Sequence, residues 1–384
     1  MKIAMLFAQE APSWRNVQVA DLATALAGLG HEVTVHGEEG PATPVPPGCR
    51  PARLRSTSEN RTTDDGQQPY MGDFVDALRA EWDYSPPDLV HAHSWRSGLA
   101  AVLAAQPAGV PVVQSFQGLG RSTDQQAGVE RLVGKQAALV LASCGQELLG
   151  LAAAGVPRSR IAMVPRGVDA GLFQPQGTTA ARTELRRIVS VADPSVGNGV
   201  ADLVAALPWL PGVELVIAGD LAPAATERLR QWARKREVEE RVRLLGAVAR
   251  EDMPALLRSA DVAACVPSHA SWEVWPLEAM ACGVPVVATA VGGLTDAVID
   301  GVTGVLVPQR DLKHLIRKLR LVLEDDTLRT SCSIAAVDRV NARHTWPDVA
   351  RAVERQYRRL LDPPVPARRR ARQVEPVVHD GVRG

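Results

Sequence analysis

The chain has 384 residues, of which 46% are hydrophobic and only 4% are aromatic. This length exceeds the size at which one hydrophobic core usually keeps growing, so two domains are expected. Because 43 basic residues balance 43 acidic ones, the composition argues against nucleic acid as a partner.

Other sequence features argue against several further classes of protein. Five scattered cysteines with no Cys-x-x-Cys pair predict buried thiols in a reducing compartment rather than a zinc site or a disulfide framework. The apolar run at residues 2–8 is too short for a signal peptide, and no run approaches the roughly 20 apolar residues of a membrane span. A cytoplasmic protein is therefore expected. The segment Gln9–Pro12, which follows that run, lacks the glycine-rich turn of a dinucleotide-binding dehydrogenase.

Short apolar runs alternate with helical patterns from one end of the chain to the other, which is typical of parallel α/β proteins. The strands expected in the first half are Ile3–Phe7, Glu32–His36, Leu89–Ala92, Val110–Gln114, Ala138–Ala142 and Ile161–Val164. Between the first two, an apolar stripe with helical spacing runs from Val19 to Leu29 and ends at Gly30. Residues 40–70 are polar and rich in proline, so a mobile surface loop is expected there.

The second half repeats the same alternation. The strands expected there are Ile188–Val191, Val213–Ala218, Val242–Leu245, Val262–Val266, Val284–Ala288 and Gly304–Val307. Residues 172–182 are rich in Pro, Gly and Thr and are predicted to form a linker, while helices are expected at 312–323 and 348–361.

The tail from residue 362 onward is predicted to be disordered, because its charges lie among prolines. It carries the basic residues Arg368, Arg369, Arg370 and Arg372. An ordinary solvated tail is the simpler interpretation. Weak contact with an anionic membrane surface, worth about 1 kcal/mol per charge, is the alternative.

The stretch Trp275–Thr289, with the sequence WPLEAMACGVPVVAT, combines a short helix with a strand. Pro276 suits the first helical position, and Gly283 suits the left-handed residue that ends the helix. Glu278 then lies in the first turn, where its carboxylate can accept hydrogen bonds from sugar hydroxyls and nearby N–H groups favour a phosphate. The alternative is that Glu278 only stabilises the helix dipole.

This stretch resembles the donor-site signature of retaining, GT-B-fold glycosyltransferases of the family-4 type, also called group 1 glycosyltransferases. Further segments resemble the family in the same order, namely Pro87–His93, Val164–Asp169, Leu215–Asp220, Ser259–Val262, Val291–Asp296 and Asp300–Gly304. The resemblance implies an α/β chain with two Rossmann-like, doubly wound domains facing across a cleft. Residues 1–172 would form the acceptor-side domain, and residues 173–344 the nucleotide-sugar domain. A helix at 345–361 would cross back onto the first domain, and 362–384 would be the basic tail.

The resemblance also implies an activity and a site. The chain would transfer a hexose from a UDP- or GDP-linked donor to an unknown acceptor with retention, with no metal or other cofactor; the sequence contains no Asp-x-Asp pair. Glu278, with Leu277 beside it, would bind the ribose of the donor. Gly292 and Gly293 would admit the phosphates, and His93 would meet the acceptor. The alternative for His93 is a strand-end histidine that is held by backbone groups.

Five features depart from the family pattern, and two of them are in the first half, where Arg15-Asn16 replaces a glycine pair and Gln117 a histidine. The other three are in the second half. The Arg and Lys that stabilise the departing diphosphate in the family align with Asp193 and Asn198, and the first of its two paired glutamates aligns with Ala270. Removing one preorganised charge-stabilising group typically costs about 10²–10³ in rate. These substitutions therefore raise a second interpretation, in which the chain is a catalytically impaired relative that binds a nucleotide, a glycan or a partner enzyme.

Arginines elsewhere are candidate replacements for the lost cations. Arg15, Arg96, Arg121 and Arg166 lie on segments that border the donor site in the family, and we expect them to converge on the cleft. Arg166 stands where the family usually has Asn, so it joins His93 as a candidate catalytic residue. Arg15 and Asn198 remain candidate donor-binding residues. The alternative for each arginine is a solvated surface position.

Overall fold

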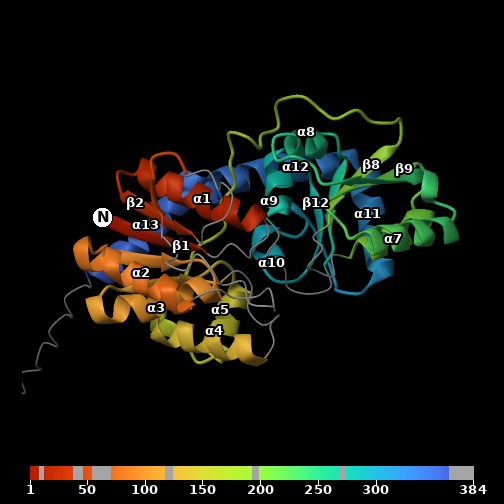
Figure 1. Cartoon of the computed structure of the whole chain (residues 1–384). Helices are drawn as coiled ribbons and strands as arrows, with labels where there is room; N and C mark the ends of the chain where they lie inside the picture. Colours follow the sequence, from red (N-terminus) through yellow and green to blue (C-terminus); the bar gives the residue numbers. More distant parts are fainter. Residues whose placement is uncertain are drawn as a thin grey trace, which may run out of the picture.

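The computed structural model describes residues 1–7, 13–37, 46–53, 71–116, 124–192, 199–267 and 274–362. Two α/β lobes lie side by side, with most of the first half of the chain on the left of Figure 1 and most of the second half on the right. Each lobe is built around one parallel sheet, which confirms the predicted fold class of two doubly wound domains. The predicted boundary at residues 172/173 stays a prediction.

The first sheet has seven strands in the order β3-β2-β1-β4-β5-β6-β7. They are β1 (Lys2–Phe7), β2 (Glu32–Gly37), β3 (Arg50–Arg53), β4 (Leu89–Ala92), β5 (Val112–Ser115), β6 (Leu139–Ala142) and β7 (Ile161–Met163). The strand β3 corrects the expectation of a loop throughout residues 40–70, since it pairs in parallel with β2. It lies at the sheet edge, where Pro51 is tolerated because one side of the strand needs no hydrogen bonds to a neighbour. A short polar edge strand has no hydrophobic alternation by which its sequence could reveal it.

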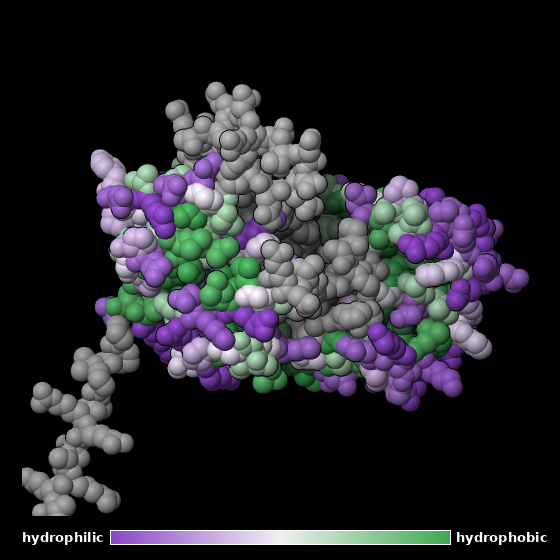
Figure 2. Space-filling view, turned by 60° about the horizontal axis from the view of Figure 1, so that its bottom comes forward, coloured by the Kyte–Doolittle hydropathy of each residue, from purple (hydrophilic) through white to green (hydrophobic). Residues whose placement is uncertain are grey.

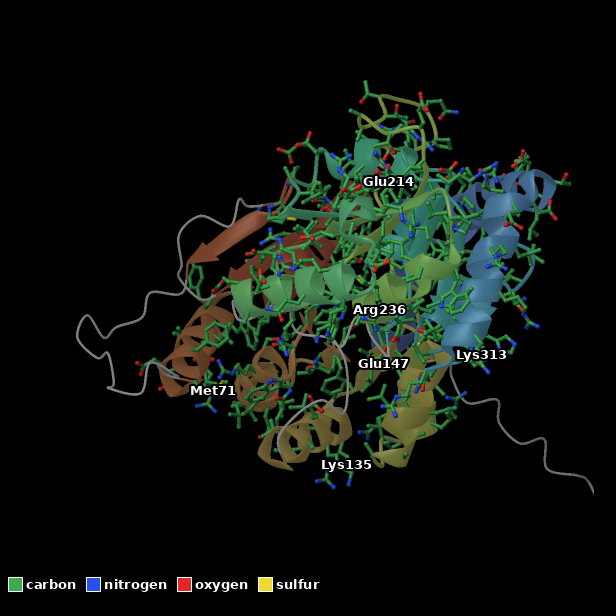
Figure 3. The ribbon with its side chains drawn as sticks, turned by 90° about the vertical axis from the view of Figure 1, so that its right-hand side faces the viewer. Met71, Lys135, Glu147, Glu214, Arg236 and Lys313 are labelled. Carbon is green, nitrogen blue, oxygen red and sulfur yellow. The ribbon has the colours of Figure 1, made fainter. Side chains whose placement is uncertain are left out.

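The second sheet has six strands in the order β10-β9-β8-β11-β12-β13. They are β8 (Arg186–Val191), β9 (Val213–Ala218), β10 (Val242–Gly246), β11 (Val262–Cys265), β12 (Val286–Thr289) and β13 (Gly304–Val307). Arg187 lies opposite Glu214 on the neighbouring strand, and its Nε donates to Glu214 Oε1 at 2.7 Å. Of the two residues, Glu214 is labelled in Figure 3. Both side chains are only 2% exposed, so the pair fixes the register of β8 against β9 from inside the lobe.

The described helices cover both faces of the two sheets. They are α1 (Ser13–Gly28), α2 (Met71–Tyr84), α3 (Trp95–Ala108), α4 (Asp124–Gln136), α5 (Gly145–Ala153), α6 (Val200–Ala206), α7 (Pro223–Lys235), α8 (Met253–Arg258), α9 (Trp275–Ala281), α10 (Leu294–Ala297), α11 (Leu312–Glu324), α12 (Asp326–Arg343) and α13 (Trp346–Leu361). Hydrophilic residues cover much of the outer edge of the second lobe, on the right of Figure 2. On that side α7 buries only Leu229 and Ala233. No helix among the described residues is long and apolar enough to cross a membrane.

The helix α12 was not expected from the sequence. It buries the small side chains of Cys332, Ala336 and Val340, and the last two pack in one core cluster with residues of α9. Because this stripe is narrow and the rest of the helix is polar, the hydrophobic period that normally reveals a helix is weak. The position of α12 matters for function, since it leads directly into the last helix.

The last helix returns to the first lobe, as the family resemblance predicts. Thr345 caps it by accepting a hydrogen bond from Asp348 N–H, and α13 then buries Val349, Val353 and Tyr357 in the core around β1 and α1. In Figure 1 α13, in blue, lies next to the red elements α1, β1 and β2. The two lobes are therefore joined both by the central segment of the chain and by this helix.

Candidate functional site

The helix α9 places Glu278 close to the junction of the lobes. The helix begins at Trp275, so Pro276 is its second residue and not its first as predicted. Gly283 follows the helix with a left-handed φ of 74°, as predicted. Glu278 is only 8% exposed, and its Oε1 accepts a hydrogen bond from Arg250 Nη1 at 3.1 Å. Burial raises the pKa of Glu278 to about 7, although Arg250 acts in the opposite direction. The carboxyl therefore changes its protonation state close to neutral pH.

Arg250 connects Glu278 to the first lobe. Its Nη2 donates to Asp21 Oδ2 on α1 at 3.2 Å, and Trp346 Nε1 at the start of α13 donates to the same oxygen at 3.1 Å. We call Glu278, Arg250, Asp21 and Trp346 the interlobe bridge. Burial raises the pKa of Asp21 as well, with Arg250 again lowering it. Because the bridge spans both lobes, Glu278 lies at their contact and not in the interior of one of them.

The guanidinium of Arg250 is also placed against an aromatic ring. Its Cζ lies 5.3 Å from the ring centroid of Phe173, within the range of a cation–π contact. Sequence reasoning missed both Arg250 and Asp21. No motif marks either residue, and their contact joins positions 229 residues apart.

The predicted phosphate-binding glycines form the turn between β12 and α10. Gly292 has a φ of 53°, and its N–H donates to Gln146 Oε1 of α5 at 2.6 Å. In the other direction, Gly145 N–H in the first turn of α5 donates to Asp296 Oδ2 at 2.8 Å. The turn therefore contacts the first lobe directly. An N–H group that the sequence assigns to a phosphate is already bonded to a glutamine that sequence reasoning did not single out.

The first turn of α5 is itself held by an acidic side chain. Glu147, labelled in Figure 3, accepts hydrogen bonds from the Ser143 N–H at 2.8 Å and from the Ser143 hydroxyl at 2.6 Å. Burial raises the pKa of Glu147. These contacts anchor the start of α5, and with it Gln146, at the carboxyl end of β6.

His93 follows β4 and lies in a buried histidine pair. Its ring centroid is 3.9 Å from that of His91, whose nitrogens contact the Tyr357 hydroxyl at 2.6 Å and the Ser115 hydroxyl at 2.8 Å. His93 Nε2 is buried and has no hydrogen-bond partner among the described residues. Burial, the neighbouring His91 and Arg166 hold the pKa of His93 well below its usual range. His93 is therefore neutral near pH 7 and can donate or accept one hydrogen bond through this nitrogen.

A small cavity of about 60 Å³ lies beside His93, and its lining includes Gln18, Ser143, Arg166 and Trp346. Its volume admits a few water molecules but not a sugar ring. His93 and Arg166, the two candidate catalytic residues, are thus brought together at one cavity. His344 Nδ1 lies 3.0 Å from the backbone oxygen of Arg166 and links that segment to the end of α12.

A larger cavity of about 480 Å³ lies between the lobes beside the α12–α13 junction. Its lining includes three predicted site residues, Arg166, Leu277 and Gly293. We call it the hinge cavity. Glu278, Gly292 and His93 are not among its described lining residues, so the structure distributes the predicted site over adjoining regions of the junction.

Several predicted residues lie outside this description. Asp193, Asn198, Ala270 and Arg121 fall outside the described residues, and Arg15 lies in α1 with a side chain that is likewise outside them. Arg96 is in the first turn of α3, with its Cζ 5.1 Å from the Trp95 ring centroid. The convergence of four arginines on the cleft therefore stays a prediction. Within the described residues, no group of three His, Cys, Asp or Glu side chains could hold a metal ion.

Both halves of the chain match models of known protein families. Residues 16–167 match the glycosyl transferase 4-like domain, and residues 179–339 match the glycosyl transferases group 1 family. The two matches together leave only the ends of the chain and the segment between the lobes unmatched.

Proteins that are similar over nearly their whole length include glycogen synthase of Mycobacterium tuberculosis, which is 30% identical over 93% of this chain and 92% of that protein. The D-inositol 3-phosphate glycosyltransferase of Xylanimonas cellulosilytica is 33% identical over 88% of this chain and 89% of its own. Among solved structures, Anabaena HepE in complex with UDP and glucose superposes with a TM-score of 0.77 at 19% identity, covering 93% of this chain and 99% of that one. At that identity, the structural likeness concerns the fold.

Proposed function

Because the chain belongs to the group 1 glycosyltransferases, we propose that it transfers a sugar from a nucleotide-sugar donor to an acceptor with retention of the anomeric configuration. The observation that carries the proposal is the position of Glu278. It lies in the first turn of a helix at the contact of the two lobes, next to the Gly292–Gly293 turn of the same lobe. A carboxylate in that position can accept hydrogen bonds from ribose hydroxyls.

The donor we propose is a UDP-linked hexose, with a GDP-linked hexose as the other option. The UDP and glucose named for the HepE structure support this choice, since the fold is shared. Arg250 occupies only Oε1 of Glu278, so ribose hydroxyls can bind at Oε2 or replace Arg250 at Oε1. If Oε1 is taken over, Arg250 Nη1 becomes available to the phosphates of the donor while Nη2 stays bonded to Asp21; the Arg250 side chain is 32% exposed.

The proposed chemistry needs no metal ion. In a retaining transfer through an oxocarbenium-like transition state, the departing phosphate can itself take the proton of the acceptor hydroxyl. His93 is neutral, so its proposed role is to orient a hydroxyl through Nε2 and not to act as a charged acid. Because the small cavity beside it does not admit a sugar ring, only a hydroxyl that reaches into this cavity can meet His93. Arg166, which lines the hinge cavity as well as the small one, would stabilise negative charge on the leaving group from the hinge cavity.

A second candidate function is supported by specific contacts. Arg250 already engages Glu278, and Gln146 already engages Gly292, so two donor-binding groups are satisfied within the protein. Together with Asp193, Asn198 and Ala270 in the sequence, these contacts favour a relative that binds a nucleotide or a partner without turnover.

One experiment separates the two functions. Purified protein is titrated with UDP- and GDP-sugars by calorimetry, and slow donor hydrolysis is followed with the anomer of the released sugar assigned by NMR. We expect a UDP-sugar to bind, Glu278→Ala to weaken it at least tenfold, and the exposed control Glu240→Ala to leave it unchanged.

Hydrolysis with retention supports transfer, whereas binding without hydrolysis supports the second function. If no nucleotide sugar binds to the wild-type protein, or if binding survives Glu278→Ala, the donor site is wrong.

A further inference from the structure

The hinge cavity has the size of a ligand site. Its volume of about 480 Å³ falls within the range of roughly 300–1,000 Å³ typical of small-molecule pockets. Both lobes contribute to its walls, Met163, Pro165 and Arg166 from the first and Gly293 and Leu294 from the second, together with residues of α12 and α13. A ligand in this cavity would therefore contact both lobes at once.

The lining of the hinge cavity carries more positive than negative charge. Its arginines are Arg166, Arg339, Arg343, Arg351 and Arg355, and its carboxylates are Asp296 and Asp348. Both carboxylates have partners already. Asp296 accepts from Gly145 N–H, and Asp348 accepts from the Thr345 hydroxyl and from Arg351.

Two of these arginines, Arg343 and Arg355, form no ion pair with a carboxylate of the described residues. Arg343 and Arg355 are exposed, and no carboxylate among the described residues lies within ion-pair distance of either. Arg339, in contrast, donates to the backbone oxygens of Asp296 and Ala297, which holds α12 against α10. The cavity therefore contains two cations that the described residues do not neutralise.

The spacing of the arginines concentrates this charge. Arg339 and Arg343 are four residues apart on α12, and Arg351 and Arg355 are four residues apart on α13, so each pair lies on one face of its helix. Like charges at this spacing destabilise a helix. A bound anion would remove that repulsion on both helices at the same time.

The remaining lining suits the organic part of a ligand. Leu294, Ala297, Ala342 and Ala352 present apolar side chains, and Met163 is 56% exposed on the same cavity. An anion that carries a carbon skeleton matches this combination better than a simple inorganic ion. Phosphate is the anion that several arginines recognise most effectively, because each planar guanidinium can donate two hydrogen bonds to it.

We propose that the hinge cavity is a binding site for an organic phosphate, held by Arg343 and Arg355 with Arg351 and Arg166 at its margins. Binding stabilises the interlobe arrangement seen here, since the ligand contacts both lobes. Two sources supply this chemistry: the diphosphate of a nucleotide sugar that extends past Gly293, and a separate phosphorylated molecule such as an acceptor or effector. In the first case the inference rests on the proposed function. In the second case it does not, and neither Glu278 nor Arg250 is among the described lining residues of the cavity.

The test is a calorimetric titration of the full chain with three probes: UDP, inorganic pyrophosphate and glucose 6-phosphate. The variant Arg343→Gln/Arg355→Gln is compared with Arg317→Gln/Arg359→Gln, which removes two exposed arginines from α11 and α13 that do not line the cavity. We expect the first variant to bind at least one probe about tenfold more weakly, and the second to bind as wild type does. Arg343→Lys/Arg355→Lys should recover part of the affinity, and unliganded melting temperatures no lower than that of the wild type show that the fold is intact.

The arms of the test separate the two sources. If UDP affinity falls in both the Arg343→Gln/Arg355→Gln variant and Glu278→Ala, the phosphate belongs to the donor. If pyrophosphate or glucose 6-phosphate affinity falls in the arginine variant while UDP affinity is kept, the ligand is a separate phosphate.

Equal affinities of the arginine variant and the wild type for every probe, or no binding of any probe by the wild type, overturn the proposal. Donor hydrolysis measured in parallel distinguishes that failure from failure of the proposed function.

Discussion

Arg250 Nη1 lies 3.1 Å from Glu278 Oε1 and donates a hydrogen bond to it. This is the carboxylate that is expected to bind the donor ribose in this family. The same guanidinium reaches Asp21 on α1. One side chain thus couples the state of the donor carboxylate to the contact between the lobes. Four predictions follow from this and the neighbouring contacts.

Replacing Arg250 is expected to destabilise the protein. Arg250→Ala leaves Glu278 and Asp21 without their shared cation, both of them in places where burial already raises the pKa. We expect the free energy of unfolding to fall by about 1–3 kcal/mol, the range for losing a hydrogen bond to a charged group. Urea denaturation measures it, with the exposed Arg243→Ala as the control. Equal stability of the two variants would show that the bridge contributes nothing.

Titration of Glu278 should make the free energy of unfolding depend on pH near neutrality. Its folded pKa of about 7 lies above its unfolded value, so the folded state holds a proton that the unfolded state releases at lower pH. The contribution of protonated Glu278 to the free energy of unfolding is therefore fully present at low pH and is lost as the pH rises through about 7. Glu278→Gln, which cannot titrate, should gain stability relative to wild type between about pH 5 and pH 8, by up to roughly 3 kcal/mol.

This difference is read from urea unfolding of both proteins at each pH, and groups common to both, Asp21 included, largely cancel in it. A difference between the two proteins that does not change with pH would contradict the raised pKa of Glu278.

Tyr357 is predicted to matter through a buried hydrogen bond. Its hydroxyl lies 2.6 Å from His91 Nδ1 and joins α13 to β4, so Tyr357→Phe leaves a fully buried imidazole nitrogen without a partner. We expect a loss of about 1–3 kcal/mol in the free energy of unfolding. Tyr84→Phe is the matched control, because Tyr84 is 94% exposed. Thermal unfolding of both variants measures this effect, and the melting temperature should fall only for Tyr357→Phe.

Removing Gln146 should improve nucleotide binding. Its Oε1 accepts the Gly292 N–H, and an incoming phosphate must displace it to reach that donor. Gln146→Ala removes this competition, so UDP affinity is expected to rise about two- to tenfold, the equivalent of one hydrogen bond. Titration calorimetry gives the comparison, with the exposed Gln231→Ala on α7 as the control. A weaker affinity in Gln146→Ala would mean that Gln146 itself contacts the nucleotide.

Most of the fold could be predicted from local patterns. Buried parallel strands are continuous apolar runs, and the strands of the centres of both sheets were predicted to within about two residues at each end. The two failures have one cause. The edge strand β3 has the sequence RPAR, and the buried residues of α12 are only Cys332, Ala336 and Val340, so neither has the strong hydrophobic period by which sequence reveals an element.

By itself, the sequence determined that Glu278 lies in the first turn of a helix with Pro276 near its start and Gly283 just after its end, because capping and left-handed turns depend on neighbours along the chain. Only the tertiary structure decided that Arg250 and Asp21 meet this carboxylate, that Gln146 reaches Gly292, and that arginines of α12 and α13 share one cavity. The physical reason is distance along the chain. Electrostatic and hydrogen-bonding partners are chosen by how two lobes and a returning helix pack, and no local pattern records that choice.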